Sequence, residues 1–328
     1  MTGTLKLVLP VLILTMISAG PAQSQEPSGD AASPNSPQAV GSLSGHTFLP
    51  TTYIMDPFIR TFLRTGLGFG MTPELDTPVS TIEGQPVAGL KGSLLYGLMS
   101  FEYQHAIRDW LAVRGGLRVV GRLADETRPL LAQGVTLASG FELGWLVRVS
   151  ESARHSVSAS LEIRNASVTD IFLERFIEGV IEDGGLTPGN HLVESTPILN
   201  GGGGLHGAYA ISDLVGLTAT GTLHYGESAD RERGETWYYS IGAAVDFNLL
   251  SQGGPPIGFV AGLKTGSAPD VPDAGDRTVQ TFFGRVGYTG SQAFALGLDM
   301  AYDLFPVRNM DTKQGYLSAV VDIRLFFR

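Results

Sequence analysis

The sequence contains 328 residues, carries a net charge of −10 and has no cysteine. The acidic balance argues against sequence-independent nucleic-acid binding, which needs a basic surface, and the lack of cysteine excludes disulfides, thiolate metal sites and lipid attachment through a cysteine. Glycine, at 43 residues, has nearly twice its usual share of about 7% and no collagen period, which favours crowded, twisted sheets over helices.

The N-terminus has the features of a secretory signal. Lys6 precedes an apolar run from Leu7 to about Ile17, and small residues follow as far as Ser24. Because the run is shorter than the roughly 20 residues that a spanning helix needs, we expect a cleaved signal peptide at 1–24 rather than an uncleaved anchor. Residues 25–45 are rich in Pro, Ser, Gly and Ala, so we expect them to form a flexible leader.

From about residue 57 onward, apolar side chains recur at every second position. This is the period of a β-strand whose two faces meet different surroundings. We predict about twelve such strands, within a range of about 10–14: 59–71, 94–103, 111–123, 135–149, 157–163, 199–211, 215–225, 237–249, 257–265, 278–288, 294–304 and 317–327.

These strands suit either a soluble barrel or sandwich with an apolar interior or a membrane barrel with an apolar exterior. Strands of ten or more residues match the 9 to 11 or so that cross a bilayer, whereas soluble strands have about 5 or 6. The second face carries ions and glycines, and tight connections such as "HAIRDW" and "SESARH" alternate with long ones such as 72–88 and 166–198. We therefore predict an all-β chain that forms a transmembrane antiparallel up-and-down β-barrel at 46–328.

Aromatic residues on the apolar face gather near the strand ends, as expected for two girdles at the membrane interfaces. They are Tyr103, Tyr209, Tyr225, Trp237, Tyr239, Phe247, Tyr288, Tyr302 and Phe327.

The closing strand, "YLSAVVDIRLFFR", alternates from Leu317 to Phe327, and Arg328 follows. Together with the strands before it, this ending resembles the Gram-negative outer-membrane β-barrel proteins, whose last strand carries an alternating signal that the barrel assembly machinery reads. The resemblance covers 57–328 as a pattern and points to no particular member of that group. It implies an outer-membrane location and contact with membrane lipid. It also implies that the leader and the tight turns lie in the periplasm and that the long loops lie outside the cell. It implies nothing about oligomeric state.

Cations outnumber carboxylates at the inward positions of these strands, although the whole chain is acidic. Arg114, Arg118 and Arg122 are four residues apart, so they stack along one wall at intervals of roughly 13 Å. Fixed cations replace part of the hydration that an anion loses in a pore, so we expect a porin-like channel for passive diffusion of small anionic solutes. The predicted lining residues are Arg60, Arg64, Arg114, Arg118, Arg122, Glu102, Glu142, Asp299 and Asp303.

The same ions can instead pair with one another inside a plugged barrel that serves structure or adhesion. The tight "HAIRDW" turn sets Glu102 nearly opposite Arg114, and closure of the last strand on the first brings Asp322 to Arg64. The number of strands does not show whether the lumen is open. Side chains fill the interior of an eight-stranded barrel, barrels of sixteen to eighteen strands enclose a water channel, and twelve lies between them. Inward glycines favour an open lumen: Gly66, Gly68, Gly70, Gly116, Gly140, Gly144, Gly216, Gly242, Gly262 and Gly287.

One segment, "SVTDIFLERFIEGVIEDGG", breaks the two-residue period. Phe172, Phe176 and Val180 are four residues apart, and Thr169 or Asp170 can cap the start. We predict a short amphipathic helix at 168–183 in an extracellular loop. Folded inward, these three side chains would gate the pore, and on the rim the helix would only cover strand ends.

A hydrolase is the remaining alternative. A dyad of His224 with Asp246 is excluded by register, because His224 falls opposite about Tyr238 and Asp246 lies roughly 26 Å further down the strand. His224 can still meet an acid from the loops, such as Glu227 or Asp230. The sequence has no recognisable nucleophile elbow and no metal-ligand spacing, so we expect no enzyme activity, no cofactor and no metal.

Overall fold

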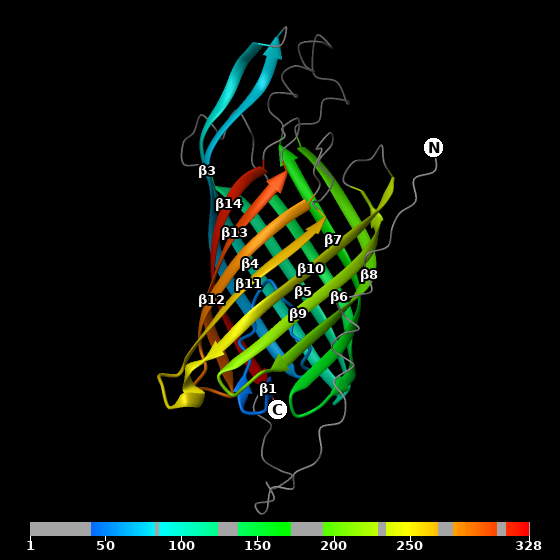
Figure 1. Cartoon of the computed structure of the whole chain (residues 1–328). Coiled ribbons are helices and arrows are strands. Elements are labelled where there is room, and N and C mark those ends of the chain that lie inside the picture. The colour runs from blue at the N-terminus through cyan, green and yellow to red at the C-terminus, as the bar shows by residue number, and fades with distance from the viewer. Residues whose placement is uncertain are drawn as a thin grey trace, which may run out of the picture. The chain divides into compact units, whose positions relative to one another are not determined.

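The computed structural model describes residues 41–82, 85–123, 137–171, 193–228, 234–267, 278–306 and 313–327. Twelve antiparallel strands form a closed barrel in which each strand pairs with its neighbours in sequence and β14 pairs with β3 (Figure 1). This confirms the predicted barrel and the pairing of the closing strand with the first. The strands are β3 (Thr61–Ile82), β4 (Gln85–Arg108), β5 (Leu111–Leu123), β6 (Leu137–Glu151), β7 (His155–Ile171), β8 (Val193–Ala210), β9 (Val215–Glu227), β10 (Glu235–Asn248), β11 (Ile257–Ser267), β12 (Thr278–Tyr288), β13 (Phe294–Pro306) and β14 (Lys313–Phe327).

The outer surface of the barrel is apolar. Alternate residues of every strand point outward, and large hydrophobic side chains such as Leu67, Leu161 and Val321 are more than half exposed. Tyr225 and Trp237 pair across β9 and β10 with ring centroids 4.9 Å apart, as expected for part of an aromatic girdle. No helix in the described residues is long and apolar enough to cross a membrane.

Two connections differ from the sequence-based expectation. Residues 72–88 were expected to form a long connection, but most of them extend β3 and β4, with register shifts near Thr72 and Pro78. Backbone pairing across a hairpin does not require side-chain alternation, so the polar sequence hid these strands. The predicted helix at 168–183 is also wrong at its start, because β7 continues to Ile171. Phe172, Phe176 and Val180 lie outside the described residues.

The two ends of the barrel differ. Short connections follow β4, β6, β8, β10 and β12, and this short-turn end also holds the start of β3 and the end of β14. The connection after β10 contains the 3₁₀ helix η2 (Leu249–Gln252). Longer connections follow β5, β7, β11 and β13 at the opposite, long-loop end.

The chain before β3 lies inside the barrel, which sequence analysis did not predict. Residues 41–60, called the plug from here on, begin with a small hairpin of β1 (Ser42–Leu43) and β2 (His46–Thr47). The plug is the blue segment within the lower half of the barrel in Figure 1. Its first five residues had been assigned to the flexible leader. The short strands and the mixed sequence gave no periodic signal that could have revealed them.

Plug side chains pack against the inner wall. Leu49 and Ile54 are buried with Ala244, Val260 and Phe283, and a second cluster toward the short-turn end is formed by Leu43, Phe48, Phe58, Ala208 and Ala210. Burial of this many apolar groups removes them from water and holds the plug in place.

Inward glycines on the wall receive these plug side chains. A Cβ added at Gly242 would lie 2.6 Å from Cδ1 of Ile54, and one at Gly287 would lie 2.7 Å from Cδ2 of Leu49. The plug occupies the space beside Gly242 and Gly287, and wall side chains occupy it beside others, such as Tyr316 at Gly70 and Phe283 at Gly262. The inward glycines therefore do not by themselves indicate an open lumen.

Candidate functional site

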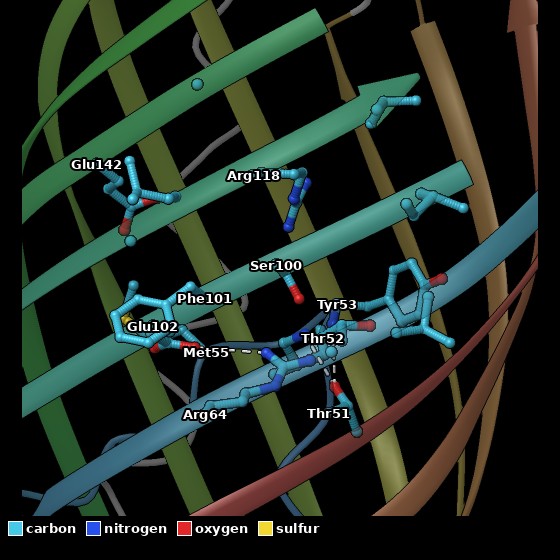
Figure 2. A pocket seen from close by; sticks show the side chains of 18 of the residues that line it. Thr51, Thr52, Tyr53, Met55, Arg64, Ser100, Phe101, Glu102, Arg118 and Glu142 are labelled. Atoms are coloured by element: carbon cyan, nitrogen blue, oxygen red, sulfur yellow. Dashed lines mark hydrogen bonds and ion pairs between the residues drawn. The ribbon is translucent and has the colours of Figure 1, made fainter. Parts of the chain in front are cut away.

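Above the plug, toward the long-loop end, lies a cavity of about 810 Å³. Its floor is formed by plug residues Thr51 to Asp56, and its wall by inward side chains of most strands. In Figure 2 the side chain of Arg118 projects from β5 into this space above Thr51, Thr52 and Tyr53. The volume lies within the range of roughly 300–1,000 Å³ that is usual for small-molecule sites.

Polar contacts anchor the plug beneath the cavity. The backbone N–H of Leu49 donates to Oδ2 of Asp246 at 2.6 Å, and His46 Nε2 lies 3.3 Å from the other carboxylate oxygen. The ring of Tyr53 stacks on Phe283 with centroids 5.0 Å apart, and its hydroxyl lies 3.3 Å from Ser318 Oγ.

Asp56 is the ionic anchor of the plug. Its Oδ2 accepts from Arg60 at 2.9 Å and from Arg324 at 2.6 Å. Burial raises the pKa of Asp56, but the charges of the two arginines outweigh burial and lower the pKa to about 2. Arg60, a predicted lining residue, therefore belongs to the plug and pairs within it, and the bond from Arg324 of β14 joins the plug to the wall.

A chain of ion pairs runs around the lumen from β12 to β4. Arg285 Nη1 donates to Asp299 at 2.8 Å and also bonds Asp322, and Arg64 donates to Asp322 at 2.9 Å and to Glu102 at 3.4 Å. Asp299 and Asp322 are almost completely buried. The expected Arg64–Asp322 pair is thus present, and Asp299 belongs to this packed network rather than to the cavity.

The chain of ion pairs continues along β5, β6 and β7. Arg114 Nη2 lies 3.5 Å from Glu102 Oε1 and 2.8 Å from Glu142 Oε1, so the second expected pair is also present. Arg164 bridges Glu142 at 3.2 Å and Glu162 at 2.5 Å. Each of these cations has carboxylate partners, so their charges are largely balanced within the wall.

Two cations in the cavity wall have no such partner. Among the residues that the structure describes, neither Arg118 of β5 nor Lys264 of β11 forms a hydrogen bond or ion pair, although both line the cavity. Lys264 is repelled by the positive charges of Arg164 and Arg118. The attraction from the carboxylates of Glu142 and Asp303 is weaker. Like charges brought together in a shielded lumen repel one another, so this part of the cavity is suited to an anion.

The remaining predicted lining residues are placed as follows. Asp303 lines the cavity and accepts from the Thr281 hydroxyl at 2.5 Å. Arg122 is on β5 opposite Tyr96, but its side chain lies outside the described residues. Lys264 was not among the predicted lining residues, and only the structure distinguishes it from the paired cations. Its cross-strand neighbours, Gly242 and Thr281, carry no charge, and this was the available signal.

His224 and His206 make buried contacts with other wall residues. The predicted register of His224 opposite Tyr238 is confirmed, and its carboxylate partner is the wall residue Glu162, whose Oε1 lies 2.7 Å from His224 Nε2. The contact crosses β8 at Gly202, where a Cβ would lie 2.7 Å from the His224 ring. His206 contacts Thr220 at 2.7 Å and Ser160 at 2.9 Å. The described ranges contain no group of three or more His, Asp or Glu that could hold a metal.

No protein-family model matches the sequence, and no curated protein matches it. Among solved structures, it is similar to the toluene transporter TodX of P. putida, with 11% identity, a TM-score of 0.48 and coverage of 88% of this chain and 98% of that chain. It is also similar to the NanC porin, at 6% identity and a TM-score of 0.44 over 82% of this chain and 100% of that chain. Similarity to the KdgM porin has an identity of 7% and a TM-score of 0.41, and it covers 80% of this chain and 99% of that chain.

A closed ring of paired strands leaves no free backbone groups at an edge, and an apolar exterior around an ionic lumen suits a lipid bilayer. The chain is a closed β-barrel of the membrane-spanning type. In this barrel, one half of the lumen holds the plug and the other half holds a cavity whose wall carries Arg118 and Lys264.

Proposed function

We propose that the barrel is an outer-membrane channel for small anionic solutes and that the plug closes it at rest. The observation that carries this proposal is the pair of cations, Arg118 and Lys264, that face the cavity and form no ion pair with any carboxylate of the described residues. The cavity as a whole has an excess of cations over carboxylates: Arg64, Arg114, Arg118, Arg164, Lys264 and Arg324 against Asp56, Glu102, Glu142 and Asp303. A solute anion would replace the missing counter-charge and regain part of its lost hydration energy.

Passage through the barrel requires the plug to move. Leu49 and Ile54 fill the lumen beneath the cavity, and their anchors are a few hydrogen bonds and ion pairs rather than a continuous sheet. Because the plug is not a strand of the barrel sheet, it can leave the lumen without breaking the hydrogen bonds between the wall strands. The plug is therefore the gate of the proposed channel, in place of the loop segment around Phe172.

Export and orientation belong to the same proposal. Residues 1–24 act as a cleaved signal peptide, the short-turn end faces the periplasm, and the assembly machinery recognises β14. The cavity is then reached from outside the cell, and plug movement releases the solute on the periplasmic side.

The occupied lumen also supports a second function, that of a permanently closed barrel in the envelope or in adhesion. In that case the plug is part of the core and the cavity is only a recess below the loops. An engineered disulfide separates the two functions. The chain has no native cysteine, and the double substitution Ile54→Cys with Gly242→Cys places a thiol on each side of a contact in which an added Cβ at Gly242 lies 2.6 Å from Cδ1 of Ile54. Loss of free thiol on oxidation reports that the disulfide has formed.

The measurement is single-channel conductance in planar bilayers before and after oxidation, with the two single-cysteine variants as controls. We expect the reduced double variant and both controls to show anion-preferring openings, and the oxidised double variant to show almost none. Cation-preferring openings, or openings that persist after the disulfide forms, would contradict the proposed channel. Absence of openings in every variant would favour the closed barrel.

A further inference from the structure

The cavity has an aromatic wall on the side of β13, β14 and β4. The ring of Tyr316 lies edge-on to Tyr96, with centroids 5.5 Å apart, and edge-on to Phe305, at 6.3 Å. All three side chains line the cavity. Gly70 of β3 makes room for the Tyr316 hydroxyl, because any Cβ at that position would overlap it. The wall between β13 and β4 is therefore an aromatic surface that faces the solute space.

The unpaired cations approach the same space from elsewhere in the ring. Arg118 is on β5, and Lys264 is on β11, the diametrically opposite strand of the twelve. Tyr53 of the plug lines the floor of the same cavity. A ligand in the cavity thus meets two cations and an aromatic surface at once.

Each simpler ligand leaves part of this cavity unmatched. An inorganic anion would compensate Arg118 and Lys264 but would leave the Tyr96, Phe305 and Tyr316 rings facing water. A neutral aromatic molecule would stack on those rings but would leave both cations without a counter-charge. A carboxylate attached to an aromatic ring matches both surfaces, since rings favour edge-to-face contact and a carboxylate accepts charge-assisted hydrogen bonds from Arg and Lys.

We propose that the cavity is a binding site for small aromatic carboxylates. The carboxylate lies between Arg118 and Lys264, and the ring rests on Tyr316 between Tyr96 and Phe305. This inference rests on the proposed channel function, and it names the class of solute. Tyr53 of the plug contacts the bound ring from below, so the plug is part of the site.

The test is calorimetric titration of the full-length protein in detergent micelles with three probes: benzoate, acetate and benzyl alcohol. Benzoate is expected to bind roughly tenfold more tightly than acetate, which lacks the ring, and than benzyl alcohol, which lacks the charge. Equal binding of benzoate and acetate, or of benzoate and benzyl alcohol, would overturn the proposal.

Variants assign the two surfaces. Arg118→Gln and Lys264→Gln are each expected to weaken benzoate binding about tenfold or more and to leave benzyl alcohol unaffected. Tyr316→Leu is expected to weaken benzoate and leave acetate unchanged, and Phe305→Leu repeats this test if the first variant does not fold. Arg154→Gln, in the exposed turn between β6 and β7, is the matched control and should bind benzoate like the native chain. Loss of benzoate binding in this control would also overturn the assignment.

Binding and transport can fail separately. Titration in micelles needs no plug movement, so benzoate binding without anion-preferring openings contradicts the channel but supports the site. Anion-preferring openings without any preference for benzoate support the channel and overturn the aromatic carboxylate site.

Discussion

The two halves of the lumen differ in whether their charged side chains form ion pairs. In the short-turn half and the middle of the barrel, each buried ion has a partner, as in the chain from Arg285 through Asp322 to Arg64. In the long-loop half, Arg118 and Lys264 face a cavity and have no ion-pair partner within the part of the chain that the structure describes. Both sets occupy inward positions of neighbouring or facing strands, so strand alternation alone does not distinguish them.

The difference separates ions that hold the barrel together from ions available to a solute. A buried ion pair loses several kcal/mol when one partner is removed, because the other charge is left unpaired. An unpaired cation in a solvent-filled cavity has no such interaction to lose. Stability measurements should therefore respond to the first set, and binding measurements to the second.

The largest expected effect is on the paired half. Asp322→Ala removes the carboxylate shared by Arg64 and Arg285 and should lower the free energy of unfolding by about 3–5 kcal/mol. Arg118→Ala should change it by less than about 1 kcal/mol. Urea unfolding in lipid vesicles, followed by tryptophan fluorescence, measures both. Equal losses in the two variants would mean that the halves do not differ in this way.

A smaller effect is expected at the boundary between plug and wall. Gly242→Val places a side chain where Ile54 lies, and overpacking of this kind costs about 1–3 kcal/mol. We expect chymotrypsin to cleave at Phe48, Tyr53 and Phe58 roughly tenfold faster, and channel openings to become more frequent. Gly221→Val is the matched control, because an added Cβ there meets nothing within 4 Å. Similar cleavage in both variants would show that the glycine does not seat the plug.

The smallest effect concerns pH. The pKa of Asp56 is lowered from 3.8 to about 2, so its ionic contribution to plug docking is complete above about pH 4 and is lost as the pH falls toward 2. Because Arg60 lies in the plug itself, only the share of this effect that comes from Arg324 bears on docking, and it is smaller than about 2 kcal/mol. Chymotrypsin is inactive at such pH, so pepsin cleavage of the plug between pH 4 and 2 is the suitable measurement. Asp56→Asn should abolish the pH dependence of plug protection, and an unchanged profile in that variant would exclude Asp56 as its source.

The barrel was predictable because every wall strand repeats the same alternation of outward apolar and inward polar or small residues. The two-residue period and the tight turns fixed which strands pair and which residues face inward, and hence the Arg64–Asp322 and Arg114–Glu102 pairs. The register was good enough to place His224 opposite Tyr238. Contacts between adjacent strands follow from such local information.

The contents of the lumen were less predictable. The plug has no period, and a wall glycine such as Gly242 has the same sequence signature whether water or Ile54 fills the space beside it. The partner of His224 lies two strands away, on β7, and is reached only because Gly202 has no side chain. Such contacts join strands that are not adjacent, and the register between neighbouring strands does not predict them.

Two side chains of strand β14 contact residues that are far away in the sequence. Asp322 joins it to Arg64 of β3 across 258 residues of sequence, and Arg324 joins it to Asp56 of the plug across 268. Contacts of such long range form late in folding, because the intervening chain must first be ordered. The ring and the plug anchor therefore become complete in the same final step. A chain that stalls before β14 has neither a sealed wall nor a seated plug, so permeability control is acquired only when folding is finished.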